Sequence, residues 1–325
     1  MKLREQGVAL LVVLLILSLM VTIAAVIAER NGRTFLRTVA QLDQLQAKWD
    51  GYTAETIAKQ ILQRSRQESP RKTHLAQNWA QSERQFETRG GDVRGQIVDA
   101  QACFNLNAIN YGVVDLTSIP YAARIFQQLL INLQVELLQA RQVTAALRDW
   151  IDRDDKPVRG GAEDEVYMGM EPPYLAANQP MQDVSELRLI RGIDTRLYRK
   201  LLPYVCVLPT SDLSVNVNTL LDSQAPLLAA LFLTKPDSLP VTELLQRRPR
   251  TGWESVAAFL DAPPLKDIDT SAAMPVLAVS SNYFLVRLHV RSGEHLFSQQ
   301  TLMQWREERF RIIQRQYGLT MREVP

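Results

Sequence analysis

The sequence contains few of the residues on which enzymes and metal centres most often depend. Its 325 residues include two cysteines and three histidines, and His74, His289 and His295 lie in separate segments. No zinc-type Cys/His spacing, nucleophile elbow or phosphate-binding glycine loop is present. We therefore predict that the protein is not an enzyme.

A charge excess of one sign is also missing. The chain has 37 Lys and Arg against 35 Asp and Glu, a formal net charge of +2. A nearly neutral chain lacks the broad basic field that attracts nucleic acids, so we predict no nucleic-acid partner. Low-complexity segments are absent as well, and the length suffices for about two or three compact units.

The most informative feature that is present is an apolar run close to the N-terminus. Residues 1–7 are polar and mildly basic, and residues 8–28 follow without a charged side chain. About 20 apolar residues span a bilayer as a helix, and the chain has no second run of this kind. A secretory signal would have a core of about 7–15 residues closed by a small-residue cleavage site. Cleavage after Gly7 would instead leave a mature chain that keeps the whole helix and begins at Val8. A plain single-pass anchor is the alternative.

The apolar run leads into a longer amphipathic segment. A continuous helix from Val8 to Leu62 would be about 80 Å long, and Gly32 and Gly51 are the positions where we expect it to be weakest. Basic residues lie on both sides of the apolar run, so charge alone leaves its orientation open. Apolar residues recur mostly at steps of three or four, the spacing of one helix face, at Phe35, Val39, Leu42, Leu45, Trp49, Tyr52, Ile57 and Ile61.

Strand patterns lie on both sides of a largely helical block. Residues 93–104 and 276–291 alternate in the manner of strands, and Ser292-Gly293 is typical of a hairpin turn. A long helical tract covers 121–151, and Asp183 with Glu186 forms a capping box. The fold class expected is α+β: a long N-terminal helix packed on a small antiparallel sheet, with a large all-α domain inserted into the sheet. We place the segments at 1–7 (leader), 8–28 (membrane part of the helix), 29–66 (rest of the helix), 67–104 (first part of the sheet), 105–208 and 209–272 (two helical subdomains) and 273–325 (second part of the sheet).

The two cysteines, Cys103 and Cys206, flank most of the first helical unit. Outside the cytoplasm they can form a disulfide, which in the chain-entropy model is worth about 4–5 kcal/mol for so long a loop. Two buried free thiols are the alternative.

The densest chemistry lies between Asp149 and Glu165, where seven carboxylates face three basic residues. Calcium takes about six to eight oxygen ligands, many of them carboxylate oxygens. Lys156 and Pro157 stand where an EF-hand loop needs an oxygen ligand and a glycine, so this is not an EF-hand. Two interpretations stay open: a calcium-binding loop of another type, or an acidic loop that is solvated. Our choices as calcium ligands are Asp152, Asp154, Glu163 and Asp164, followed by Asp155 and Glu165.

Residues 186–202 and 216–232 look like helix-hairpin-helix modules, which often bind DNA through hairpin amides. Asp194 stands where a second hairpin glycine is expected, and residues 233–240 contain no glycine. We therefore favour a packing or protein-contact role. A membrane-anchored DNA-binding or DNA-uptake protein is the alternative function.

Several stretches together closely resemble the K-type minor pseudopilins of type II secretion, and the leader resembles a class III signal of type IV pilins and pseudopilins. These stretches are the leader with its apolar helix, CFNLN at 103–107, ALRDWIDRDD at 146–155, GAEDEVY at 161–167, PPYLAANQPMQDVSELRLIRGID at 172–194 and VNVNT at 215–219. The resemblance implies a pseudopilin fold whose helical insertion binds calcium. It also implies a place at the tip of the periplasmic pseudopilus with the I and J minor pseudopilins.

The same resemblance implies how the chain reaches its place. A prepilin peptidase would cut between Gly7 and Val8, and the bulk of the chain would lie in the periplasm, held in the inner membrane beside the secretion platform. Major pilins have a glutamate at the fifth mature position, where it pairs with the N-terminus of a neighbouring subunit. Here that position is Val12, which suits a tip subunit because an unpaired carboxylate is costly in lipid. Val8 also replaces the usual Phe or Met at the position that the family methylates.

Overall fold

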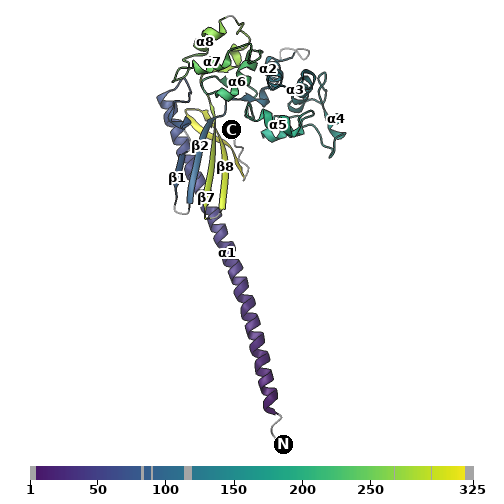
Figure 1. Ribbon diagram of the computed structural model, residues 1–325, viewed down its shortest axis with the longest axis vertical. Helices are drawn as coiled ribbons and strands as arrows, with labels where there is room; N and C mark the ends of the chain where they lie inside the picture. The colour runs from purple at the N-terminus through teal and green to yellow at the C-terminus, as the bar shows by residue number, and fades with distance from the viewer. Residues whose placement is uncertain are drawn as a thin grey trace.

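The computed structural model describes residues 5–81, 84–88, 91–112, 119–266, 268–293 and 295–318. A single helix, α1 (Glu5–Glu68), forms a stalk that projects from a sheet, and a helical domain lies at the end of the molecule opposite the N-terminus (Figure 1). Residues 1–4 of the predicted leader lie outside the described residues, while Gly7 falls within α1.

The stalk helix is continuous over 64 residues and ends at Glu68, six residues beyond Leu62 and two beyond the end of the predicted segment 29–66. Neither Gly32 nor Gly51 interrupts it. A Cβ atom at Gly51 would lie 3.1 Å from Gln299 Oε1 on the sheet, so this glycine allows the sheet to approach the helix closely. The expectation of a weak point at Gly51 is therefore wrong, because the glycine is a packing position.

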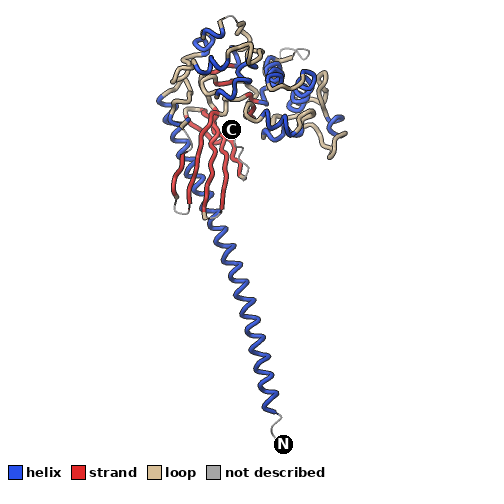
Figure 2. Tube along the Cα trace, viewed as in Figure 1, coloured by secondary structure: helices blue, strands red, loops and turns tan. Residues whose placement is uncertain are grey.

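Five antiparallel strands form the sheet in the order β1-β2-β7-β8-β9. Its centre joins strands from distant parts of the chain, since β2 pairs with β7 with Val93 opposite Val290 (Figure 2). The predicted hairpin at Ser292-Gly293 connects β7 and β8, with Gly293 at φ +56°. The strand bounds are β1 (Arg84–Glu87), β2 (Gly91–Asp99), β7 (Tyr283–Ser292), β8 (His295–Arg306) and β9 (Arg309–Tyr317).

The predicted alternation in β7 is confirmed, because Phe284, Val286, Leu288 and Val290 are buried in the cluster that also contains the small residues of α1. The predicted strand at 93–104 is too long. Strand β2 ends at Asp99, and β3 (Phe104–Asn105) pairs in parallel with β4 (Val205–Cys206) inside the helical domain.

Between β2 and β7 the chain forms a mainly helical domain. The expectation of an all-α domain is corrected by two short parallel strand pairs, β3 with β4 and β5 (Val215–Asn216) with β6 (Leu277–Ala278). The predicted tract at 121–151 is two helices, because Gln134 adopts φ +61° and Glu136 then caps the second helix through Leu138 N and Gln139 N. The predicted capping box of Asp183 and Glu186 is present and starts a 3-10 helix. The helices are α2 (Tyr121–Asn132), α3 (Leu137–Ile151), α4 (Asp164–Met168), α5 (Thr195–Leu201), α6 (Ala225–Leu231), α7 (Val241–Gln246) and α8 (Val256–Leu260). The fold is thus α+β with an inserted helical domain, and the exact segment boundaries stay predictions.

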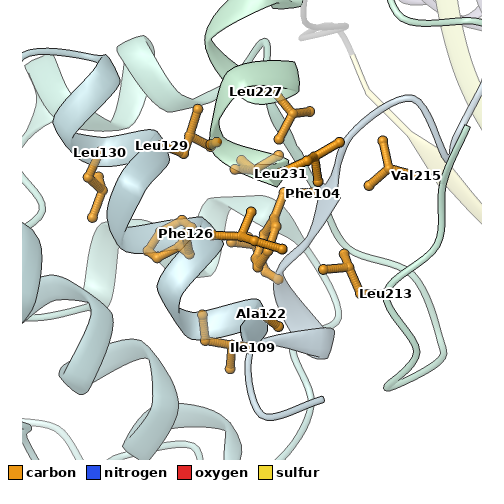
Figure 3. Close-up of a cluster of buried hydrophobic side chains, with 14 of the residues drawn as sticks. Phe104, Ile109, Ala122, Phe126, Leu129, Leu130, Leu213, Val215, Leu227 and Leu231 are labelled. Carbon is orange, nitrogen blue, oxygen red and sulfur yellow. The ribbon is translucent and has the colours of Figure 1, made fainter. Parts of the chain in front are cut away.

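The core of the helical domain gathers side chains from β3, α2 and α6. Figure 3 shows Phe104, Phe126, Leu129 and Leu231 in this buried cluster. Cys103 and Cys206 form a disulfide beside it, with Cα atoms 5.8 Å apart.

The two asparagine motifs act as internal braces. In CFNLN, the amide of Asn107 donates to Met181 O and Leu208 O, both at 3.0 Å. In VNVNT, the amide of Asn216 donates to Asp99 Oδ2 at 2.8 Å, and Ser281 Oγ donates to the same oxygen. Asp99 closes β2 and Ser281 precedes β7, so this network joins the sheet to the helical domain.

Candidate functional site

The acidic loop is built around one buried carboxylate at the end of α3. Asp149 is fully buried and accepts hydrogen bonds from Val158 N at 3.0 Å and Ala162 N at 2.7 Å. These two bonds fold the segment after α3 back over its own helix end. Asp149 therefore shapes the loop, and burial raises its pKa to about 6.

Two glycines make this return of the chain possible. Gly160 has φ +85°, a left-handed conformation that glycine adopts without steric cost. A Cβ atom at Gly161 would overlap the carboxylate of Asp149, so a side chain there is incompatible with the loop as it stands. Each of the two glycines therefore has its own steric reason.

Two further side chains in the loop, Glu163 and Asp152, have carboxylate oxygens without a hydrogen-bond donor in the described part of the chain. Glu163 is 4% exposed, and among the described residues neither of its carboxylate oxygens has a partner; the same holds for Oδ1 of Asp152. Burial, together with the neighbouring negative charge of Asp149, raises the pKa of both groups to about 7. A buried carboxylate without a donor is costly when ionised, so this place favours either a proton or a cation.

A second segment approaches the loop through the AANQP motif. Asn178 Nδ2 donates to Asp155 Oδ1 at 2.8 Å, and Ala176 N donates to Asp164 Oδ1 at 2.8 Å. Asn178 Oδ1 has no partner among the described residues. The amide oxygen of Asn178 is therefore a further free ligand atom of the kind that calcium uses.

The structure brings together part of the predicted ligand set. The charges of Asp152, Asp155 and Asp164 all act on Glu163. Asp154 instead accepts from Lys156 N at 2.9 Å in its own turn, and Glu165 is exposed in the first turn of α4. Across the described ranges, no three His, Cys, Asp or Glu side chains already converge as a metal cage. Any cation here would also need amide or backbone oxygens.

Sequence reasoning missed two residues of this site. Asp149 was counted in the acidic run but not recognised as the residue that organises it, and Asn178 was quoted only as part of a motif. The signal for Asp149 was its place on the buried face of α3, between Trp150 and the buried Ala146. No local pattern indicates Asn178, because its approach depends on the tertiary fold.

The other functional element is the N-terminal part of α1. Val8 and Val12 are both at least half exposed, as are most apolar side chains up to Ile27. In the described part of the chain, α1 is the helix long and apolar enough to cross a membrane, with a mean hydropathy of 3.2 in its most apolar window. The N-terminal helix therefore fits a single-pass anchor that carries a folded bulk.

The helix-hairpin-helix segments are not arranged to bind DNA phosphates. The side chain of Asp194 accepts a hydrogen bond from Leu197 N at 2.7 Å and caps α5, so this backbone amide is already paired and is not available to a phosphate. These helices instead pack into the common core of the domain.

Comparisons with known proteins agree over nearly the whole chain. Residues 102–210 and 215–280 match the family described as Type II secretion system (T2SS), protein K. The chain is 52% identical to the type II secretion system protein K of Klebsiella pneumoniae, with 97% of each chain covered. It is 49% identical to that of Pectobacterium carotovorum subsp. carotovorum, with 98% of each covered.

A solved structure supports the same assignment. The chain resembles one chain of the GspK-GspI-GspJ complex from the type 2 secretion system of enterotoxigenic Escherichia coli, with a TM-score of 0.81 and 35% sequence identity. The match covers 87% of this chain and 100% of that one. From its sequence motifs, its fold and these relatives, the chain belongs to the type II secretion system protein K family.

Proposed function

We propose that the protein is a minor pseudopilin that forms the tip of the periplasmic pseudopilus together with the I and J minor pseudopilins. The observation that carries the proposal is the similarity to a chain that is crystallised in a complex of three different subunits. The tip helps to initiate pseudopilus assembly for the export of folded proteins. This role is mechanical, and we propose that the protein has no enzymatic activity.

The place of the helical domain supports a tip position. It extends beyond the end of the sheet, on the side away from the N-terminus of the stalk (Figure 2). A subunit added above this one would meet the helical domain, whereas subunits added below would meet the exposed lower stalk. The inserted domain therefore suits the end of an assembly that grows from the membrane.

The N-terminal segment supplies the membrane part of this role. We infer that a prepilin peptidase cuts between Gly7 and Val8, that Val8 is then N-methylated, and that residues 8–28 stay in the inner membrane next to the secretion platform. The bulk of the chain lies in the periplasm, where a disulfide such as Cys103–Cys206 is stable. Val12 in place of a glutamate leaves no unpaired charge in the lipid.

We propose that the acidic loop binds calcium. The support is a buried glutamate, Glu163, whose carboxylate oxygens have no partner among the described residues, next to the free oxygens of Asp152 and Asn178. Asp155 and Asp164 lie in the same network and would complete the oxygen set, whereas Asp154 and Glu165 stay predictions. Bound calcium would supply the positive charge that the loop lacks and would hold residues 152–164 against 174–178.

A secretion assay tests the proposed function. In a strain that lacks the gene for this chain, the full chain should restore export of the folded substrates of the system. The same chain with Gly7→Ala should stay unprocessed and should fail to restore export. Normal export without the chain, or normal processing of Gly7→Ala, would contradict the proposal.

A further inference from the structure

Three arginines lie on α1 directly beyond the apolar run. Arg30, Arg33 and Arg37 follow one another at steps of three and four residues. At about 100° per residue they fall within an arc of about 60°, so they share one face of the helix. All three residues are exposed. We call these three residues the arginine stripe.

The rest of the folded chain does not cover the arginine stripe. Residues 29–39 are exposed throughout, and Ala47 is the first buried residue in the described part of α1. Figure 1 shows the lower part of α1 extending away from the sheet and from the helical domain. Any group that binds the stripe, other than the side chains of α1 itself, therefore comes from outside the described chain.

The helix itself does not neutralise the arginine stripe. Between residues 8 and 42 the sequence has one carboxylate, Glu29, against the three arginines, so this stretch has a net charge of +2. Glu29 pairs with Arg33 in an exposed ion pair. Exposed pairs of this kind are weak and easily replaced by other partners. The stripe therefore favours an anionic partner.

The arginine stripe stands at the height of lipid headgroups. Residues 8–28 are about 32 Å long as a helix, which matches a hydrocarbon core about 30 Å thick. With this run in the core, Arg30 and Arg33 stand about 3 Å and 8 Å beyond Ala28, within a headgroup layer about 5–8 Å thick. Arg37 stands about 14 Å beyond Ala28, or about 10 Å along the membrane normal at a helix tilt of about 40°.

Helix geometry directs these side chains back towards the membrane. In an α-helix the Cα–Cβ bonds tilt towards the N-terminus, so a long side chain covers the turn before its own Cα atom. Arg33 shows this direction, because its guanidinium reaches back to Glu29. The N-terminus of α1 is on the membrane side, so Arg37 leans towards the headgroups in the same way. A guanidinium can donate two parallel hydrogen bonds to one phosphate.

We propose that the arginine stripe binds the phosphates of anionic phospholipids, in the leaflet on the side of the folded domains. The bound headgroups fix the depth of the membrane helix. Cleavage after Gly7 removes Lys2 and Arg4, and the stripe then holds every Lys and Arg between Val8 and Ala47. The inference rests on the proposed function in one respect, since it takes α1 to be a membrane anchor that is processed at Gly7.

Native mass spectrometry of the chain released from nanodiscs tests the class of lipid. The mature chain, expressed with prepilin peptidase, is placed alone in nanodiscs of equal phosphatidylglycerol and phosphatidylcholine, which share a phosphate and differ in net charge. We expect the lipid that stays bound to be enriched in phosphatidylglycerol at least about fivefold, the usual gain from one basic residue at an anionic surface. Equal retention of the two lipids would overturn the proposal and leave the stripe to a carboxylate of a protein partner.

Matched variants assign the enrichment to the arginine stripe. Arg30→Gln, Arg33→Gln and Arg37→Gln together should bring the ratio of the two lipids to about one. Arg64→Gln should leave the ratio unchanged, because Arg64 is exposed on the same helix about 54 Å beyond Ala28. Glu29→Gln should raise the enrichment, because it removes the competing carboxylate from Arg33.

The outcomes separate this proposal from the proposed function. An enrichment that survives in the triple variant, that falls equally in Arg64→Gln, or that does not rise in Glu29→Gln would overturn the role of the stripe while the anchor stands. A chain that is not cut at Gly7, or that does not stay in the nanodisc, would overturn the anchor and the proposed function together with the stripe.

Discussion

Glu55 on the stalk helix and Arg315 on the last strand form a bidentate ion pair, with both N–O distances at 2.8 Å. Glu55 is buried, and it also accepts hydrogen bonds from Gln299 and Thr301 of β8. The carboxylate of Glu55 raises the pKa of Arg315 by hydrogen bonding to it. One side chain of the stalk therefore satisfies donors on two strands and fixes the sheet on the helix.

Removing this carboxylate should weaken the packing of the sheet on the stalk. Glu55→Ala takes their acceptor from Arg315, whose side chain is 37% exposed, and from Thr301, while Gln299 keeps the hydroxyl of Thr301 as acceptor. We therefore expect a loss of about 1–3 kcal/mol, the usual cost of leaving a buried donor unpaired. The measurement is the free energy of unfolding of the full chain in detergent. Glu68→Ala is the matched control, because it removes an exposed pair with Arg64 on the same helix that is worth at most about 0.5 kcal/mol. Equal effects of the two variants would refute the role of Glu55.

The buried glutamate of the acidic loop should control calcium binding. Glu163→Gln removes the buried negative charge, so we expect calcium no longer to raise the melting temperature. Glu171→Gln, an exposed glutamate outside the acidic run, should leave calcium binding as it is. Isothermal titration calorimetry on both variants decides between Glu163 as a ligand and a loop that holds calcium elsewhere.

The stability of the calcium-free protein should fall as the pH rises. Asp152 and Glu163 have pKa values of about 7 and Asp149 of about 6, all above their usual values near 4. The folded state therefore holds more protons than the unfolded state between about pH 4 and pH 7, so its advantage is lost as the pH rises through that window. Calcium at about 100 times its dissociation constant should add about 2.7 kcal/mol above pH 7. Melting curves with calcium and with chelator, from pH 5 to pH 8, test this directly; a calcium-free melting temperature that rises over the range would contradict the account.

Because Gly161 lies against Asp149, adding a single methyl group at position 161 should strongly reduce both stability and calcium affinity. Gly161→Ala places a Cβ atom on the carboxylate of Asp149, so the loop must move and calcium affinity should fall together with stability. Gly32→Ala is the control, because no atom lies near its added methyl, and replacing a helical glycine should stabilise the protein by about 0.5–1 kcal/mol. Thermal unfolding with and without calcium should separate the two variants, and an undisturbed Gly161→Ala protein would show that the loop has a different shape.

Local sequence patterns were sufficient to predict the elements whose own residues share a periodicity. The three-to-four spacing after Arg30 predicted the stalk, and the alternation from Phe284 to Val290 predicted the central strand. Strand sequence on both sides of a helical block was enough to infer the insertion. Each of these follows from a periodicity that residues within one element share.

Features that depend on contacts between distant segments could not be predicted in this way. The sequence suggested that Gly51 weakens the helix. Its structural role is to allow the close approach of Gln299, which lies on another element and could not be seen in the local pattern. The end of β2 at Asp99 reflects the bonds that Asp99 forms with Asn216 and Ser281. Asn178 could not be predicted as part of the acidic site for the same reason, because its contact with Asp155 is a tertiary one.

Native mass spectrometry of the membrane-extracted complex, expressed with prepilin peptidase and with the I and J subunits, tests the central claim most directly. We expect one copy each of this chain, I and J, with this chain beginning at Val8. A chain that keeps Met1, or one that leaves the membrane alone or bound only to copies of itself, would contradict the assignment to the pseudopilus tip.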